Sequence, residues 1–121
     1  MDKKRVLVVD DNEDLLKMLR LRIEAEGYEF MSAKDGDEML NVMKMKRPDV
    51  IILDIMLPRM DGYSALREMR KKEGLKDIPV IVLTAKEKRK LGDLFALEKV
   101  ANFIEKPFDV KDLLEEIRSV L

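Results

Sequence analysis

Charged and hydroxyl side chains follow four runs of strand-forming residues, each at the point where the run stops. Asp10 and Asp11 follow VLVV, Asp54 follows VIIL, Thr84 follows VIVL and Lys106 follows NFIE. Each of these side chains alone has an ordinary explanation, such as a helix cap, a turn or a solvated loop. Their shared position after successive runs argues instead for one common site.

The chemistry of this set is that of an oxygen-liking metal ion. Two carboxylates about 4 Å apart repel each other by roughly 4 kcal/mol at an effective dielectric constant of 20. One lysine offsets one charge, so three ionised carboxylates close together require a divalent cation. Mg²⁺ prefers such oxygen ligands, keeps several waters and binds phosphate oxygens. A carboxylate beside Mg²⁺ can attack a phosphoryl group and form an aspartyl phosphate.

Asp54 is the best candidate for the attacking carboxylate. It ends the run VIIL, which is expected to be the central strand, where packing on both sides fixes the direction of the side chain. Thr84 can donate its hydroxyl to a phosphoryl oxygen, and the Lys106 ammonium can neutralise the phosphoryl charge.

The elements that must position these residues alternate between strands and helices. Apolar runs without alternation predict strands that helices cover on both faces. Gly27 and Pro48 mark the ends of the first two helices, and Asp109 is the expected N-cap of the last. The expected strands are 5–9, 28–32, 50–53, 78–83 and 102–104, and the expected helices are 13–26, 36–46, 62–72, 87–98 and 109–120.

This order of elements is (βα)₅ and belongs to the α/β class. Because parallel crossovers are right-handed, it predicts a doubly wound, five-stranded parallel sheet. In such sheets ligands bind outside the carboxyl ends of the strands, where the candidate residues stand. We expect a single domain over residues 1–121, with no effector domain among them.

Composition narrows the classes of function. The chain has 24 basic and 25 acidic residues and a net charge of -1, so no direct nucleic-acid or membrane partner is indicated. It shows neither a membrane span nor a signal peptide, so the cytoplasm is the expected location. Cys and His are absent, which excludes zinc-type sites, Cys or His nucleophiles and Ser-His-Asp triads.

The stretches VLVVDDNED, PDVIILDIMLPRMDG, VIVLTA and FIEKPF resemble the receiver domain of two-component response regulators. The resemblance covers essentially the whole chain at close to family spacing. It implies the flavodoxin-like and CheY-like strand order 2-1-3-4-5. It also implies a signalling domain that promotes its own phosphorylation and autodephosphorylation and is not a conventional enzyme.

The resemblance assigns roles to individual residues. Asp54 is similar to the phospho-acceptor, and Thr84 and Lys106 resemble the hydroxyl and the ammonium that sense the phosphoryl group. The implied metal ligands for Mg²⁺ are Asp10, Asp11, Asp54 and the backbone carbonyl of Met56. Phe103 resembles a switch aromatic that turns inward after phosphorylation, and the Lys106–Pro107 peptide bond resembles one that is usually cis.

The implied phosphoryl donor is a phosphohistidine on a sensor histidine kinase. Phosphorylation adds about -1.5 to -2 charges at Asp54 and would switch the surface formed by the fourth helix, the fifth strand and the fifth helix. A downstream effector protein or domain would read this surface, with the chain acting as a monomer or a phosphorylation-dependent homodimer. The sequence Lys99-Val100-Ala101, where the family commonly has Gly-Ala, departs from the pattern in this region.

Three alternative functions are compatible with parts of the pattern. A pseudo-receiver would act only as a protein-binding module, but it would ordinarily have lost one of the five candidate residues. A haloacid-dehalogenase-like phosphatase usually has a second Asp where this chain has Met56. A flavodoxin-like cofactor binder needs an amide-rich first turn, and the acidic pair Asp10-Asp11 would repel its phosphate.

Overall fold

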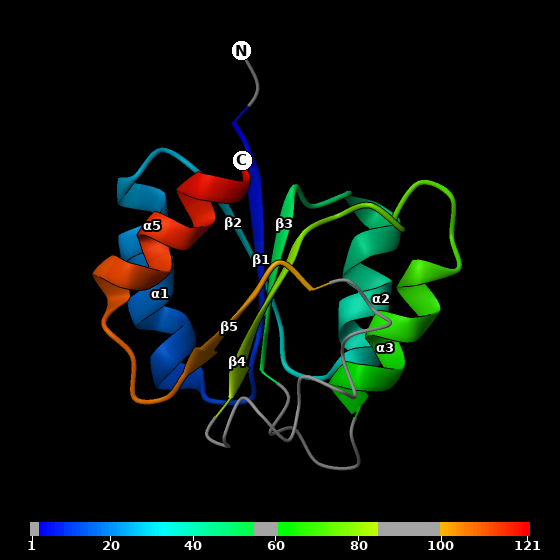
Figure 1. Cartoon of the computed structure of the whole chain (residues 1–121), viewed down its shortest axis with the longest axis horizontal. Coiled ribbons are helices and arrows are strands. Elements are labelled where there is room, and N and C mark those ends of the chain that lie inside the picture. The colour runs from blue at the N-terminus through cyan, green and yellow to red at the C-terminus, as the bar shows by residue number, and fades with distance from the viewer. Residues whose placement is uncertain (1–2, 55–60, 85–99) are drawn as a thin grey trace.

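Five parallel strands form one sheet in the order β2-β1-β3-β4-β5, and their arrowheads point towards the lower edge in Figure 1. The computed structural model describes residues 3–54, 61–84 and 100–121. The strands are β1 (Arg5–Val9), β2 (Glu29–Ala33), β3 (Val50–Asp54), β4 (Val80–Thr84) and β5 (Asn102–Glu105). The predicted α/β fold and strand order are confirmed.

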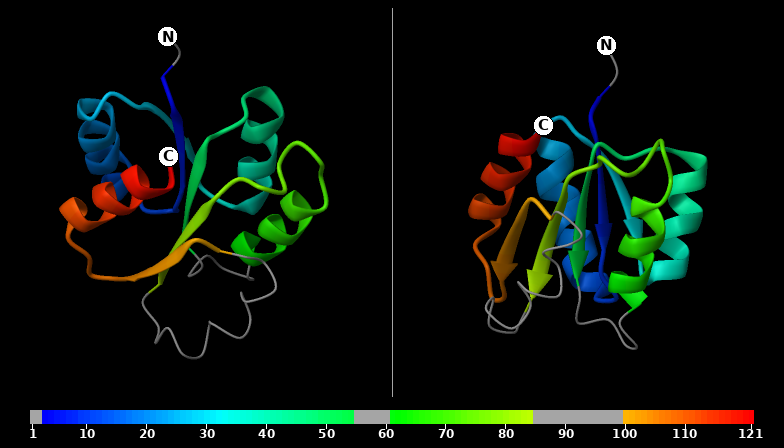
Figure 2. Two further views of the ribbon diagram at one scale, coloured as in Figure 1. Left: turned by 45° about the horizontal axis from the view of Figure 1, so that its top comes forward. Right: turned by 45° about the vertical axis from the view of Figure 1, so that its right-hand side comes forward.

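Helices cover both faces of the sheet. Figures 1 and 2 show α1 (Glu13–Ala25) and α5 (Val110–Val120) on one face, with α2 (Gly36–Met45) and α3 (Asp61–Arg70) on the other. The predicted helix over 87–98 lies outside the described residues. None of the described helices combines the length and the apolar character needed to cross a bilayer.

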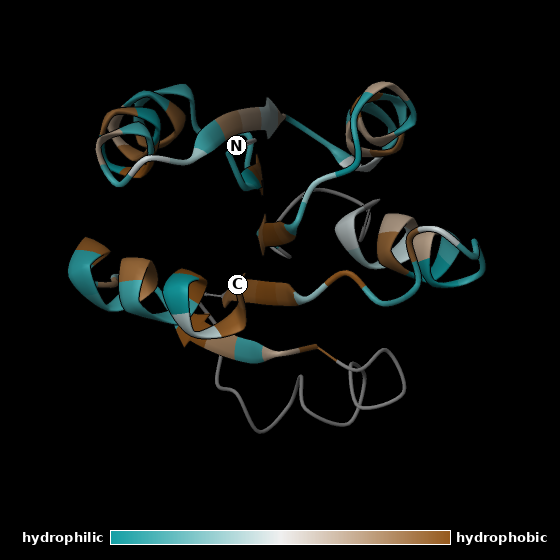
Figure 3. Cartoon of the chain, turned by 90° about the horizontal axis from the view of Figure 1, so that it is seen from above, coloured by the Kyte–Doolittle hydropathy of each residue, from teal (hydrophilic) through white to brown (hydrophobic). Residues whose placement is uncertain are grey.

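The core has two halves because neighbouring residues of a strand point to opposite faces of the sheet. Val6, Ile52 and Ile81 pack with residues of α1 and α5, whereas Leu7 and Ile51 pack with residues of α2 and α3. Figure 3 shows the hydrophobic colour on the strands in the middle of the sheet and a mixture of both colours on the outer strands and on the helices. This double burial explains why the strand runs are apolar without alternation.

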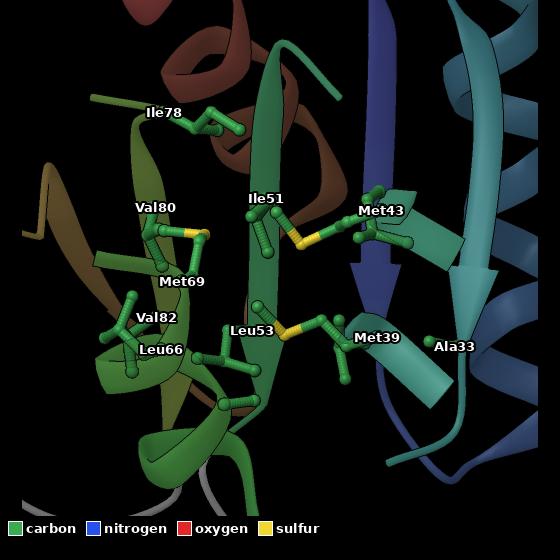
Figure 4. Packing of buried hydrophobic residues seen from close by; sticks show 13 residues of the cluster. Ala33, Met39, Met43, Ile51, Leu53, Leu66, Met69, Ile78, Val80 and Val82 are labelled. Atoms are coloured by element: carbon green, nitrogen blue, oxygen red, sulfur yellow. The ribbon is translucent and has the colours of Figure 1, made fainter. Parts of the chain in front are cut away.

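Three methionines contribute to the core on the α2 and α3 face. Met39, Met43 and Met69 are buried, and Figure 4 shows them around Ile51 and Val80. Met is unbranched and flexible, so it fills irregular gaps between elements. The buried β3 strand therefore ends at Asp54 with side chains packed against both of its faces.

Local signals account for most helix ends, although β2 and β4 start later than predicted and every strand except β1 ends one residue later than predicted. Gly27 follows α1 with a φ of 91°, and the Asp109 side chain caps α5 by accepting a hydrogen bond from the Lys111 N–H. β2 starts at Glu29 instead of residue 28, and β4 starts at Val80 instead of Ile78. Pro79 has no N–H to donate to the sheet, and the Ile78 N–H bonds to the Leu75 carbonyl instead, so β4 begins later.

Candidate functional site

The parallel sheet brings together candidate residues that are far apart in the sequence. Asp10 follows β1, Asp54 is the last residue of β3, and Lys106 follows β5. β1 and β3 are neighbours in the sheet, with Val9 paired with Leu53, so Asp10 and Asp54 emerge side by side. The described residues therefore show Asp10, Asp54 and Lys106 at one edge of the sheet, where the sequence predicts that they meet.

Lys106 joins the two aspartates. Its Nζ donates hydrogen bonds to Asp10 Oδ2 at 3.0 Å and to Asp54 Oδ2 at 3.2 Å. Asp10 is 0% and Asp54 3% exposed, and among the described residues they are the buried polar or charged ones. Because two buried carboxylates are costly without a counter-charge, the shared ammonium is what makes their close approach tolerable.

The carboxylates also control the titration of Lys106. Burial by itself lowers the pKa of a lysine, because it penalises the charged ammonium. The hydrogen bond to Asp10 and the negative charges of Asp54 and Asp10 act in the opposite direction and outweigh burial, so the pKa of Lys106 is raised above its ordinary value. Lys106 therefore carries a positive charge at neutral pH.

A third carboxylate completes a group that suits a hard cation. Asp10, Asp11 and Asp54 each offer one oxygen, and these oxygens lie within 4.8 Å of one another. Asp11 is exposed, whereas Asp10 is held in place because its Oδ1 accepts a hydrogen bond from the Asn12 N–H at 2.9 Å. Three oxygen ligands, one of them on an exposed side chain, fit Mg²⁺, which retains part of its water shell.

Three further predicted site residues stand differently in the structure. Thr84 is the last residue of β4 and pairs with Glu105 of β5, so its backbone lies at the same edge of the sheet, while the role of its hydroxyl stays a prediction. Met56 lies outside the described residues. Phe103 is half-buried and packs against the core on the α2 and α3 face. The Lys106–Pro107 peptide bond is cis, as the family resemblance implies.

Sequence reasoning missed two contacts near the site. Lys34, just after β2, donates a hydrogen bond from its Nζ to Glu13 Oε1 at 2.7 Å, which lowers the pKa of Glu13 and raises that of Lys34. β2 is next to β1, so the strand order alone would place Lys34 near the start of α1. Asn12, not Asp10 or Asp11, is the N-cap of α1 and accepts a hydrogen bond from the Leu15 N–H.

The sequence is similar over nearly its whole length to proteins that are named as transcriptional regulators. It is 40% identical to the probable transcriptional regulator ycf27 of Cyanophora paradoxa, covering 100% of this chain and 49% of that protein. It is 33% identical to the alkaline phosphatase synthesis transcriptional regulatory protein PhoP of Bacillus subtilis, covering 98% of this chain and 48% of that protein. The chain thus spans about half the length of these relatives.

Solved structures show the same fold. The chemotaxis protein CheY4 of Vibrio cholerae superposes with a TM-score of 0.92 at 29% identity, covering 99% of this chain and 100% of that one. The HemR receiver domain of Leptospira biflexa superposes with a TM-score of 0.87 at 33% identity, covering 98% and 94%. The family model described as "Response regulator receiver domain" matches residues 6–118. Since this match spans nearly all of the sheet and its helices, the chain belongs to the receiver-domain family of two-component response regulators.

Proposed function

We propose that the chain accepts a phosphoryl group on Asp54 from the phosphohistidine of a sensor histidine kinase, in a reaction that needs Mg²⁺. The observation that carries this proposal is the shared contact of Lys106 with Asp10 and Asp54 beside the carboxylate of Asp11. This arrangement places the Asp54 carboxylate beside one fixed cation and beside two further carboxylates that can hold a metal ion. A nucleophile with positive charges next to it is what a phosphoryl acceptor needs.

The chemical step is a displacement at phosphorus. An Asp54 carboxylate oxygen attacks the phosphoryl group, a P–O bond forms and the P–N bond to the donor imidazole breaks. The electron pair of the broken bond stays on the imidazole nitrogen, which takes a proton from water. Lys106, already 3.2 Å from Asp54 Oδ2, would then balance charge on a phosphoryl oxygen. In autodephosphorylation, water attacks the phosphorus and Asp54 leaves as a carboxylate.

Asp10, Asp11 and Asp54 would hold the Mg²⁺ ion, with the Met56 carbonyl as a further proposed ligand. When bound, the ion supplies positive charge to the phosphoryl oxygens and lowers the repulsion between donor and carboxylates. Asp10 is restrained because it accepts hydrogen bonds from Lys106 Nζ and from the Asn12 N–H. Its role would be to orient the Lys106 ammonium and to balance the positive charges of Lys106 and the metal ion. Asp11 is exposed and can rearrange as the metal enters.

The signal would leave through Thr84, Phe103 and the surface that includes β5 and α5. Thr84 is the last residue of β4, and Lys106 follows the neighbouring strand β5. Movement of both side chains towards the phosphoryl group would therefore pull on the connections to this surface. The relatives are named as transcriptional regulators, and this chain matches about half of each. We therefore infer an effector domain or protein as the receiver of the signal, acting in the cytoplasm.

Intact mass after incubation with acetyl phosphate tests the proposal. With Mg²⁺ we expect one phosphate adduct that is labile to alkali, and without Mg²⁺ we expect almost none. Asp54→Asn should abolish the adduct because the attacking oxygen is replaced by an amide. The exposed Asp112 in α5 offers a matched control, and Asp112→Asn should retain the adduct.

Two results would contradict the proposal. An adduct of unchanged yield in Asp54→Asn would exclude Asp54 as the acceptor. A wild-type chain that takes up no phosphate from acetyl phosphate or from phosphoramidate would instead support a pseudo-receiver that acts only by binding proteins.

A further inference from the structure

The first turn of α3 lies directly against the end of β3. Gly62, the second residue of α3, is buried. A Cβ atom built on Gly62 would lie 3.2 Å from the main-chain oxygen of Asp54 and 3.1 Å from Leu53 Cδ1. Both distances are tighter than ordinary carbon contacts, so a side chain here would require Leu53 and the main-chain oxygen of Asp54 to give way by a few tenths of an ångström.

Space, not backbone conformation, accounts for a glycine at this position. Gly27 has a φ of 91°, which is the left-handed region that favours glycine, whereas Gly62 lies in helical backbone that alanine adopts more readily. Gly74 makes the contrast clear, because a Cβ there would meet nothing within 4 Å. A poor helix former in the first turn of α3 is thus explained by the close approach to Leu53 and Asp54.

The two neighbours of Gly62 differ in how they can respond. The Leu53 side chain can change rotamer, and Figure 4 shows it at the end of β3 beside Leu66 of α3. The Asp54 oxygen is part of the backbone, so it can move only with its peptide plane. That movement would turn the Asp54 side chain, which is 3% exposed and bonded to Lys106 Nζ. Small misplacements of a reacting group cost large factors in rate.

We propose that Gly62 is a positioning residue, because its missing side chain lets α3 rest on the Asp54 carbonyl and so fixes the direction of the Asp54 carboxylate towards Lys106 and the metal-binding oxygens. The effect on phosphorylation rests on the proposed function of Asp54, whereas the effect on the Asp54 carboxylate does not.

The test compares Gly62→Ala with Gly74→Ala. Two quantities are measured for each: the phosphorylation rate constant with acetyl phosphate at saturating Mg²⁺, and the carbon-13 chemical shift of the Asp54 carboxyl in metal-free protein. We expect Gly62→Ala to slow phosphorylation about tenfold and to shift the carboxyl signal. Urea titrations should show that too little of the variant is unfolded under the assay conditions to explain the slower rate. Gly74→Ala should match the wild type in both quantities.

A second variant separates the two contacts. Leu53→Val removes the 3.1 Å contact to Cδ1 but leaves the 3.2 Å contact to the Asp54 oxygen. The double variant Leu53→Val/Gly62→Ala should therefore stay slow and keep the displaced carboxyl signal, relative to Leu53→Val alone. If Gly62→Ala does not fold, the less crowded double variant carries the same comparison.

Three results would overturn the inference: a Gly62→Ala chain with the wild-type rate and carboxyl signal, full recovery of both in the double variant, or a rate loss equal to the unfolded fraction. If the wild type takes up no phosphate, the proposed function fails, and the carboxyl signal of metal-free Gly62→Ala decides the positioning role by itself.

Discussion

At the scale of single residues, Lys106 has a structural role before it has a chemical one. Its ammonium lies between two carboxylates that are almost fully buried, and its own side chain is 26% exposed. Removing one partner of a buried ion pair leaves uncompensated charge, which costs several kcal/mol. The residue that would stabilise the phosphoryl group therefore also stabilises the site before any phosphate arrives.

The substitution Lys106→Met should destabilise the metal-free chain. It keeps most of the apolar stem but leaves Asp10 and Asp54 to repel each other, so we expect the free energy of unfolding to fall by about 2–3 kcal/mol at pH 7. Urea unfolding followed by circular dichroism measures this difference. Lys34→Met, which removes an exposed partner of Glu13, should leave the stability almost unchanged.

The comparison of the wild type with Lys106→Met also gives a test of pH dependence. The pKa of Lys106 is raised above its ordinary value of 10.5, so its contribution to stability is complete below pH 10.5 and is lost as the pH rises through the raised pKa. The stability difference between wild type and Lys106→Met should thus be constant from pH 8 to about pH 10 and shrink above that. A difference that grows above pH 10.5 would contradict the assigned contacts of Lys106.

At the scale of elements, the caps connect the helices to the site. Asn12 Oδ1 accepts a hydrogen bond from the Leu15 N–H at 3.1 Å, and the Asn12 N–H itself bonds to Asp10 Oδ1. The side chain of Asn12 therefore serves α1, whereas its backbone serves the acidic cluster. A change in the side chain should affect one of these and not the other.

Asn12→Ala tests this division of roles. Loss of the cap should reduce the free energy of unfolding by about 1 kcal/mol, while Asn12→Ser, which can still accept a hydrogen bond, should retain most of it. Phosphate uptake from acetyl phosphate should persist in both variants because the N–H bond to Asp10 remains. An alanine variant as stable as the wild type would show that the cap contributes nothing.

The elements also show which features are predictable from the sequence. Runs such as VLVV predict buried strands because both faces are covered, and the parallel arrangement then places Asp10, Asp54 and Lys106 at one edge. Features that depend on tertiary contacts are harder to predict from the sequence. The start of β4 depends on where the Ile78 N–H finds an acceptor, and the Lys34–Glu13 bond depends on the rotamers of two exposed side chains.

The contact at Gly62 is likewise hard to predict from the sequence. The residue types around it suggest a turn or a helix start, but the closeness of α3 to the Asp54 carbonyl is a distance between two elements. Such distances are set by packing in the core, here against the methionine-rich face that contains Met39 and Met69. Sequence pattern predicts which faces meet, and the side-chain volumes decide how closely they approach.

At the scale of the whole molecule, the acidic cluster exists only when the sheet is formed. Asp10 and Asp11 follow β1, Asp54 ends β3, and the β1–β3 pairing that joins them connects residues far apart in the chain. An ion that binds all three carboxylates therefore binds the folded chain and not the unfolded one. Metal binding and global stability are thus thermodynamically linked.

This linkage predicts that Mg²⁺ stabilises the entire chain. At a Mg²⁺ concentration about 100 times the Kd, the free energy of unfolding should rise by about 2.7 kcal/mol, measured by urea titration against NaCl of equal ionic strength. Asp11→Asn removes one proposed ligand from an exposed position, so it should reduce the increment without disturbing the core. Asp14→Asn, an exposed change in the first turn of α1, should keep the full increment. Equal increments in wild type and Asp11→Asn would place the ion elsewhere, because a carboxylate that ligates the ion cannot be neutralised without loss of affinity.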